Sequence, residues 1–455
     1  MHVKTRWGRW MLPLVAGFLG LAAAAWAIEP AARLAQKSKT PRTSAKPAAN
    51  DLAIAEAERG DWSRWRGPNN DGVSQERGLL TTWPAEGPPL VWKAGGLGGG
   101  FSSVSVADGK IYTMGAKQGT TITCRDIKDG AEVWTTRIGG GDNPNCTPTV
   151  DGELVYGVSK EGDLACCKTA DGELAWKKNF KQDFDGKMES SWGFSESPLI
   201  DGDLLICTPG GQNAMLAALN KKTGETVWMT KMPAERGRKG NDGSGYSSIV
   251  LGNCAGVKQY ITLVGRGVIG VDAKTGELLW GYNPVANGTA NIPTPIVKGD
   301  LVFCSSGYGD GGTALLKISK NGKKVNAEEV YWHDANQLQN HHGGMILVGD
   351  HVYMGHGHDQ GFPVCVELKS GKAVWGPDRG PGGGSAGLTY ADGHLYFRYQ
   401  DGIMALIEAS PKSYKLKGKF KVATHHGEGW PHPVIAGGKL YLRDQNELLC
   451  YDVRK

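Results

Sequence analysis

The chain has 455 residues, of which 40% are hydrophobic and 21% are charged, and its formal net charge is +5. Residues 1–60 hold nine Lys or Arg and four Asp or Glu, which leaves 42 basic and 42 acidic residues in the remainder. A body with balanced charge argues against nucleic acid or an anionic membrane surface as a partner, because both bind proteins through clustered positive charge.

The first residues have the pattern of an export signal. Arg6 and Arg9 precede an apolar stretch at 11–26, and Ala25-Trp26-Ala27 resembles the small-residue site at which signal peptides are cleaved. The apolar stretch is nearly long enough to span a bilayer, so an uncleaved anchor is the alternative. We expect residues 1–27 to direct the protein to the periplasm or out of the cell. Contact with a membrane is expected only through an uncleaved leader.

Residues 28–60 predict a flexible linker, since 37–50 is rich in Ala, Pro, Lys, Ser and Thr. One short helix is expected within the linker, at 52–59. The segment 62–68, with Trp62 and Trp65, then leads the chain into its folded domain.

A turn followed by a tryptophan recurs through the rest of the chain. Its best copy is Asp272-Ala-Lys-Thr-Gly-Glu-Leu-Leu-Trp280. The tryptophans of successive copies lie 42 to 52 residues apart, at Trp134, Trp176, Trp228, Trp280, Trp332 and Trp375. A period of about 40–50 residues, made of short strands and Gly turns, is typical of a β-propeller.

Each tryptophan is preceded by two apolar strands with a tight turn between them, such as Asp201-Gly202. Both positions of such a turn need positive φ, so the pattern indicates a β-hairpin. Eight hairpins are expected, beginning near Phe101, Thr147, Ser197, Ser247, Pro293, Gly344, Ala386 and Pro431.

Two strands are left over at opposite ends of this pattern. A strand at 89–93 has no hairpin before it, and the last hairpin, which ends at 448–453, has no outer strand after it. Pairing the two removes both open edges. The sequence therefore predicts an all-β fold over 61–455, an eight-bladed β-propeller of four-stranded antiparallel blades. Its ring is closed by the N-terminal outer strand.

The nine cysteines are expected to be packing thiols. Four of them fall at one place in the third strand of their blades, which small residues occupy in other blades: Cys124, Cys166, Cys365 and Cys450, with Ala218, Gly270 and Ala405. Small apolar residues at a fixed blade position suit a core, and a free thiol fills that role. Cys166 and the adjacent Cys167 both lie inside a strand, where neighbouring side chains point to opposite faces, so no disulfide is expected between them.

The face that carries the blade-to-blade connections has the longer loops and is expected to hold any site. Seven of the eleven histidines fall on its loops in blades six to eight: His341, His342, His356, His358, His425, His426 and His432. With Asp359 or Glu428 they are candidate ligands for a divalent transition metal, or an acid and base near neutral pH. The alternative is that they hydrogen-bond the loop backbone, since their spacing matches no signature such as H-E-x-x-H.

A second candidate group leads into the third blade at 191–198, where Trp192 stands near Glu196. A carboxylate beside aromatic rings can ligate a cation or act as a base of raised pKa. The alternative is that Glu196 bonds neighbouring loop amides. Asn145 and Asn291, which lead into blades two and five, offer amide oxygens to a hard cation such as Ca²⁺.

The A/C-x-D-x-x-T-G-x-x-x-W rhythm, seen best at 271–280, resembles the quinoprotein-type repeat of PQQ-binding-like β-propellers, and the resemblance extends over 62–453. The compact, BamB-like members include the propeller subunit of the outer-membrane β-barrel assembly machine. The larger members are PQQ-dependent alcohol dehydrogenases. They hold the quinone with Ca²⁺ on the upper face, between a Trp and a vicinal disulfide, with an Asp as base.

The resemblance implies cofactor-binding roles for a few residues of the present chain. By location alone, Glu196 and Asn291 are candidate Ca²⁺ ligands and Trp430 is a candidate stacking platform for the quinone. Trp192 is a further cofactor-binding candidate. The catalytic Asp has no counterpart, so the catalytic residues stay unknown. The cysteine that anchors the assembly subunit to lipid is absent from the leader.

Two hypotheses follow. In the first, the protein is an exported, monomeric binding scaffold that holds a protein, peptide or glycan on its loop-rich face. In the second, it is a PQQ- or metal-dependent oxidoreductase, similar to alcohol or sugar dehydrogenases, with its site in the same funnel. Whether the protein is an enzyme is left open between them.

Overall fold

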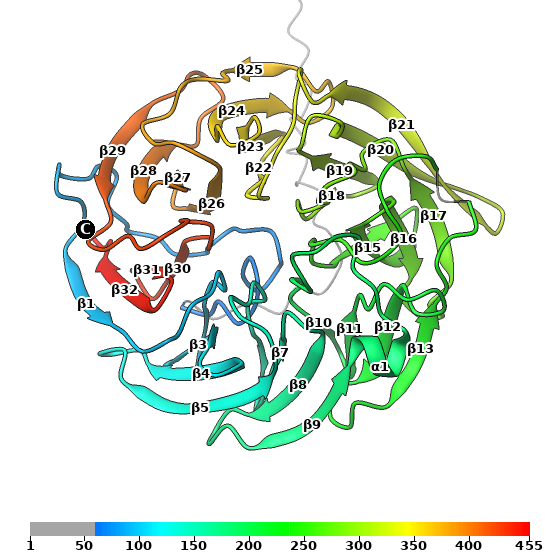
Figure 1. The fold of residues 1–455 in the computed structure, drawn as a ribbon. Helices are drawn as coiled ribbons and strands as arrows, with labels where there is room; N and C mark the ends of the chain where they lie inside the picture. Colours follow the sequence, from blue (N-terminus) through cyan, green and yellow to red (C-terminus); the bar gives the residue numbers. More distant parts are fainter. Residues whose placement is uncertain (1–59, 236) are drawn as a thin grey trace, which may run out of the picture. The chain divides into compact units, whose positions relative to one another are not determined.

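The computed structural model describes residues 60–235 and 237–455. The expected leader, linker and short helix lie outside these residues. The described chain forms eight four-stranded antiparallel sheets arranged around a central axis, which confirms the predicted eight-bladed β-propeller (Figure 1). Among the described residues, no helix is long and apolar enough to cross a bilayer.

The strands of each blade follow in sequence order from the axis outwards (Figure 1). Blade one contains β2 (Ser105–Ala107), β3 (Lys110–Ala116), β4 (Thr120–Asp126) and β5 (Glu132–Gly139), and blade two contains β6 (Thr149–Asp151), β7 (Leu154–Val158), β8 (Asp163–Lys168) and β9 (Leu174–Asn179). Blade three contains β10 (Leu199–Asp201), β11 (Leu204–Cys207), β12 (Leu216–Asn220) and β13 (Thr226–Thr230). Blade four contains β14 (Val250–Cys254), β15 (Val257–Val264), β16 (Gly267–Asp272) and β17 (Leu278–Tyr282).

The next three blades contain β18 (Ile296–Lys298), β19 (Leu301–Ser306), β20 (Gly312–Asn321) and β21 (Lys324–Asp334); β22 (Ile346–Val348), β23 (His351–His356), β24 (Phe362–Glu367) and β25 (Ala373–Trp375); β26 (Ala386–Ala391), β27 (His394–Tyr399), β28 (Ile403–Glu408) and β29 (Leu416–Lys421). Blade eight contains β30 (Val434–Ala436), β31 (Lys439–Asp444), β32 (Glu447–Asp452) and, as its outer strand, β1 (Leu90–Ala94).

The ring closes through β1. This strand pairs antiparallel with β32, with Trp92 opposite Cys450 and Lys93 opposite Leu449. The predicted closure by an N-terminal outer strand is therefore confirmed. The C-terminal segment supplies three strands of blade eight and the N-terminal segment supplies the fourth, so this blade is complete only when both ends of the domain meet.

Neighbouring blades are joined by a tryptophan of one blade and a glycine of the next. A Cβ added to Gly172, Gly224 or Gly276 would lie 2.5–2.8 Å from ring atoms of Trp134, Trp176 or Trp228. Each of these glycines also has positive φ, 72–77°. The Trp134 indole donates to the carbonyl of Thr169 at 3.0 Å, just before the turn of blade two. The repeated Thr-Gly and the repeated Trp are thus two sides of one interface.

The same tryptophans explain the cysteines. Cys124, Cys166, Cys365 and Cys450 each lie opposite the tryptophan of the neighbouring outer strand, and Ala218 and Gly270 hold that place in blades three and four. All nine cysteines of the sequence are buried free thiols, and Cys166 and Cys167 both lie within β8. The expectation of packing thiols is borne out, because a large indole on one strand leaves room only for a small side chain opposite.

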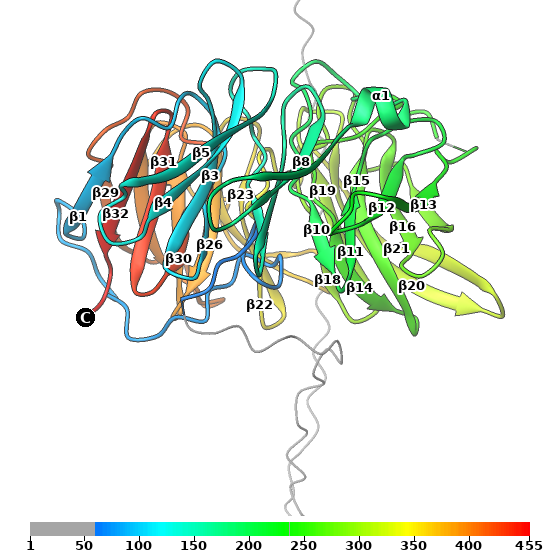
Figure 2. The same ribbon diagram turned by 90° about the horizontal axis from the view of Figure 1, so that it is seen from below.

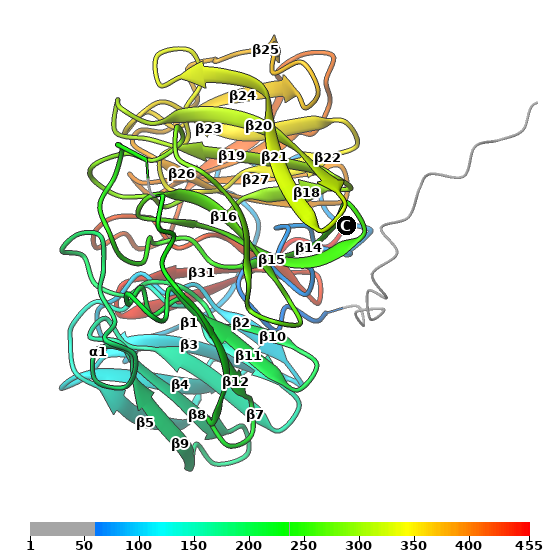
Figure 3. The same cartoon turned by 90° about the vertical axis from the view of Figure 1, so that its right-hand side faces the viewer.

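The two faces of the ring differ, as Figures 2 and 3 show. The five-residue helix α1 (Phe180–Phe184), in the connection from β9 to β10, lies at the face of the blade-to-blade loops. The tight turns, such as the one between β30 and β31, lie at the opposite face. We call these the loop face and the turn face.

Residues 61–79, which we call the crossing segment, run across the middle of the ring toward its turn face (Figure 2). Their hydrogen bonds reach six blades: Trp62 to Val106, Ser63 to Val150, Arg64 to Ile200, Arg66 to Met345, Ser74 to Tyr390 and Ile435. The carboxylate of Glu76 accepts from the amides of Gly437 and Gly438, at 2.8 and 3.1 Å. The sequence predicted only that this region leads into the ring. Here it covers the central channel from one side.

We predict that Gly276→Ala destabilises the protein more than Gly256→Ala. Both glycines have φ of 72–74°, so both substitutions place Ala in the left-handed region at about 1–2 kcal/mol. A Cβ at Gly256 has no atom within 4 Å, whereas one at Gly276 would overlap the Trp228 ring at 2.5 Å. The overlap adds about 1–3 kcal/mol. Denaturant midpoints of the two variants measure the difference, and equal midpoints would contradict a role for this contact.

Candidate functional site

A cavity of about 460 Å³ lies on the axis and opens at the loop face. Its wall comes from loops that lead into the innermost strands and from loops between second and third strands, and its floor comes from the crossing segment. The residues that the following paragraphs use are Trp65, Arg66, Phe101, Lys160, Trp192, Tyr246, Tyr308, His341, His342, His358, Asp359, Trp430 and His432. The predicted loop-rich face therefore carries the cavity, and Trp65 and Arg66 of the crossing segment line it as well.

The floor is a buried arginine with a tryptophan beside it. The Arg66 guanidinium donates to main-chain carbonyls of Asp71 and Met345. Burial without a bonded carboxylate lowers the pKa of Arg66 to about 10. Trp65 packs against His432, with ring centroids 4.7 Å apart. Because the guanidinium is satisfied by backbone, its role in the floor is structural.

Aromatic side chains line two sides of the cavity. The Trp430 ring packs against Phe101 at 4.6 Å and meets His342 edge-on at 4.8 Å between centroids. On the other side, Trp192 packs edge-on against Tyr246 and is 49% exposed. An exposed tryptophan beside a concave aromatic surface is a feature of ligand and partner sites.

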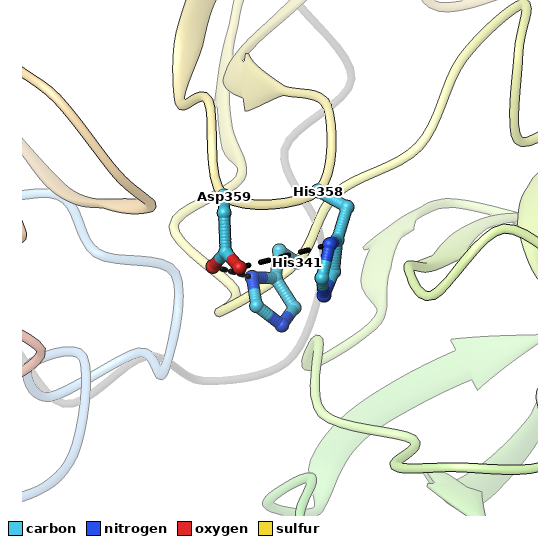
Figure 4. Close-up of side chains that lie close together, drawn as sticks. All are labelled: His341, His358 and Asp359. Atoms are coloured by element: carbon cyan, nitrogen blue, oxygen red, sulfur yellow. Dashed lines mark ion pairs between the residues drawn. The ribbon is translucent and has the colours of Figure 1, made fainter.

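Three ionisable side chains of blade six lie together on the wall, His341, His358 and Asp359 (Figure 4). His341 precedes β22, and the other two stand on the loop between β23 and β24. The Asp359 carboxylate is 3.2 Å from Nδ1 of His341 and 3.7 Å from Nδ1 of His358. Burial, together with the neighbouring His358, lowers the pKa of His341 to about 4, so the imidazole is neutral at pH 7.

Deeper imidazoles are neutral as well. Burial lowers the pKa of His432 to about 3 and holds that of His342 well below its usual range. Several buried polar atoms around the cavity have no hydrogen-bond partner in the described part of the chain: His341 Nε2, His342 Nδ1, His432 Nδ1 and Trp430 Nε1. Groups of this kind are costly to bury, so they mark places where a ligand or water would bond.

Eight of the candidate residues chosen from the sequence line the cavity, namely Asn145, Trp192, His341, His342, His358, Asp359, Trp430 and His432. Others lie elsewhere. The His356 ring accepts from the Gln339 amide at 3.3 Å. His425 pairs with Asp444 at 3.1 Å, and His426 with Glu447 at 3.4 Å. These three histidines are not among the residues of the cavity wall.

Of the three candidate Ca²⁺ ligands, Asn145 lines the cavity, whereas Glu196 and Asn291 are buried beside it. Ser195 and Ser197 line the cavity, but Glu196 between them points away, and its Oε1 accepts from the Thr208 amide at 2.5 Å. Asn291 is enclosed as well, and its side-chain amide donates to Glu189 at 2.6 Å. Burial raises the pKa of both Glu196 and Glu189 to about 7.

Sequence reasoning missed Tyr308, Tyr246 and the two floor residues. Tyr308 follows the end of β19 by two residues, as His358 follows the end of β23, so alignment of blades five and six places the two together. Trp65 and Arg66 belong to no repeat. No periodic signal points to them.

Replacement of Glu196 by Gln should change how stability depends on pH. A carboxyl whose folded-state pKa of about 7 exceeds its ordinary value of 4.5 favours folding below pH 4.5, and this advantage is lost as the pH rises to 7. The free energy of unfolding of Glu196→Gln, relative to the parent, should therefore rise by up to about 3 kcal/mol between pH 4.5 and pH 8. The pH-dependent contribution of Glu189 is the same in the parent and the variant, so it cancels in the difference between their free energies of unfolding. A difference that stays constant with pH would contradict the raised pKa.

The chain is similar to known propellers in sequence and in fold. A family model described as outer membrane protein assembly factor BamB matches residues 76–161 and 118–377. The BamB of Shewanella oneidensis is 23% identical over 228 residues, covering 49% of this chain and 52% of that protein. Tetrathionate hydrolase of Acidithiobacillus ferrooxidans is 22% identical over 262 residues, covering 53% and 46%. The chain thus spans about half the length of these curated relatives.

Solved structures agree on the fold. The quinohemoprotein alcohol dehydrogenase of Comamonas testosteroni has a TM-score of 0.64 at 14% identity, with 90% of this chain and 83% of that chain covered. At such identity the likeness concerns the fold alone. The family model, by contrast, matches well over half of the sequence. The chain belongs to the family that this model describes, outer membrane protein assembly factor BamB, whose propellers are built from the PQQ-like repeat.

Proposed function

We propose that this chain is an exported binding scaffold that takes a segment of a partner protein into the funnel of its loop face. The observation that carries the proposal is the cavity of about 460 Å³ with aromatic walls. A cavity of this size receives a few side chains of a ligand rather than a whole domain. The exposed Trp192 at the cavity suits the anchoring of a partner, since tryptophan is enriched among residues that dominate binding energy.

The lining favours a polypeptide ligand. Aromatic rings offer contact for apolar or aromatic side chains, while wall residues such as Asn143, Asn145 and Gln400 offer hydrogen bonds to peptide groups. The cavity wall contains one arginine, one lysine and one aspartate, so its charge is nearly balanced. A neutral peptide segment therefore fits better than a strongly anionic ligand. A glycan would use the same aromatic rings and is the second ligand class to test.

The comparisons support a protein partner. Relatives from Shewanella oneidensis and Burkholderia pseudomallei carry the description outer membrane protein assembly factor. If the present chain acts in a similar setting, its site of action is the periplasm, in line with the expected export signal. That its whole role equals theirs does not follow, since the alignments cover about half to three fifths of those proteins.

The alternative function is a PQQ- or metal-dependent oxidoreductase with its site in the same funnel. The residues do not fit the quinone and Ca²⁺ arrangement that the resemblance implies. Cys166 and Cys167 lie buried in β8 as free thiols, and Glu196 and Asn291 bond other protein groups outside the cavity. Arg66 and Lys160, the wall cations that would face an anionic quinone, are engaged by carbonyls and by Asp142. We therefore favour the scaffold.

A photo-crosslinking amino acid at Lys160, on the cavity wall, should capture a discrete partner in the native cells, whereas one at Lys323 should not. Lys323 lies at the exposed tip between β20 and β21, on the turn face (Figure 2). Trp192→Ala should lower the cross-linked yield about tenfold, because loss of an aromatic anchor costs about 1–2 kcal/mol. Val330→Ala, an exposed residue of β21, is the control. Equal yields from both positions, or no effect of Trp192→Ala, would contradict the proposal.

Titration of the purified protein with PQQ and Ca²⁺ separates the two functions. We expect no saturable one-to-one binding at micromolar concentration, because the funnel lacks a matching set of free cationic and hard-oxygen groups. Quinone absorbance after gel filtration is the measurement. Stoichiometric retention of the quinone would favour the oxidoreductase and would justify a screen of alcohols and sugars.

A further inference from the structure

The ionisable cluster of blade six has the dimensions of a metal site. Each of His341, His358 and Asp359 offers a ligand atom, and the three atoms lie within 4.8 Å of one another. With metal–ligand bonds of about 2.1 Å, two ligands of a tetrahedral ion are about 3.4 Å apart. The distances from the Asp359 carboxylate to the two imidazoles, 3.2 and 3.7 Å, lie on either side of that value.

A hydrogen-bonded cluster does not account for all three residues. At 3.7 Å, His358 Nδ1 is too far from Asp359 to form a hydrogen bond. One carboxylate is thus shared between two imidazoles and bonds at most one of them. A cation bound by Asp359 and the Nδ1 atoms of the two histidines would satisfy the carboxylate and His358 together.

The surroundings hold the ligands in place and leave the cluster open. Tyr308 packs against both imidazoles, with centroids 4.6 Å from His341 and 4.9 Å from His358. The Ser385 hydroxyl lies 2.6 Å from His341 Nδ1 and 3.4 Å from Asp359. Because Ser385 bonds the same nitrogen that faces Asp359, an ion held at Nδ1 would replace this hydrogen bond. The side chains of His358 and Asp359 are 43% and 55% exposed, so an ion has access from solvent.

We propose that His341, His358 and Asp359 bind one divalent transition metal ion, with Zn²⁺ the best match to the donors. Two imidazoles and a carboxylate suit Zn²⁺ and its neighbours, whereas Ca²⁺ and Mg²⁺ take oxygen ligands. Three protein ligands leave at least one coordination position for water or for an anionic group of a ligand, as in open zinc sites. Because the cluster lines the cavity, that position is reached from the funnel. The inference goes beyond the scaffold function and does not depend on which partner binds.

The test is metal binding by untagged full-length protein, freed of metal with chelator and titrated with Zn²⁺ by calorimetry, with Co²⁺ absorption as a second readout. We expect one ion per chain, a dissociation constant in the micromolar range or below, and a rise in melting temperature with added Zn²⁺. His358→Ala and Asp359→Ala should each weaken binding at least about tenfold and remove the rise in melting temperature. Both positions are exposed, so the variants should melt like the parent in chelator.

His426→Ala is the matched control, since His426 is also exposed and also pairs with a carboxylate, that of Glu447, away from the cavity wall. It should bind Zn²⁺ like the parent. Failure of the parent to bind a stoichiometric ion would overturn the proposal. Binding that survives in His358→Ala and Asp359→Ala would overturn it too, because the ion would then be held elsewhere. Either failure leaves the cross-linking test of the scaffold function unaffected.

Discussion

The contact between a tryptophan of one blade and a glycine of the next is the interaction on which the ring depends. It recurs from blade one through blade four with Trp134, Trp176 and Trp228, and Trp92 of β1 makes it again over Gly130 when blade eight meets blade one. In blade five, Tyr331 takes the place of the indole over Gly371. Blades one, two and three each carry both the glycine of one such interface and the tryptophan of the next. A single blade therefore has no partner for its outer ring and cannot be stable alone.

Closure of the ring alone would leave an open channel, and the crossing segment turns that channel into a binding cavity. The floor residues Trp65 and Arg66 are held by contacts to blades that lie on opposite sides of the axis, as with Arg64 on Ile200 and Arg66 on Met345. The wall residues come from loops whose ends are fixed by the strands of the blades but which do not belong to the sheets themselves. The funnel thus combines a rigid frame with chemically variable loops, which is how propellers acquire different ligands on one architecture.

The fold was predictable because its signals repeat, whereas the site was predictable only where the repeat reaches it. Turn glycines, tryptophans and small residues gave the blade count, the closing strand and the state of the cysteines. His341, His358 and Trp430 could be selected as site candidates because the repeat places their loops on the loop face. Glu196 shows where prediction from the sequence fails. Its neighbours Ser195 and Ser197 face the cavity and Glu196 does not, and in a loop no periodic pattern in the sequence indicates the direction of a side chain. The crossing segment has no repeat at all, and it bonds the blades largely through main-chain groups.

The order of events during synthesis follows from the crossing segment. Ser74 bonds the carbonyl of Ile435, which lies 361 residues later in the chain. The strand β1 pairs with β32, which is about as far away in the sequence. The segment made early is therefore placed late, since its binding surfaces exist only after the last blade has been translated. Contacts so remote in sequence make folding slow. Until then the pairing edge of β1 and the axial ends of the earlier blades stay uncovered. Exposed strand edges of this kind make a nascent chain prone to aggregation.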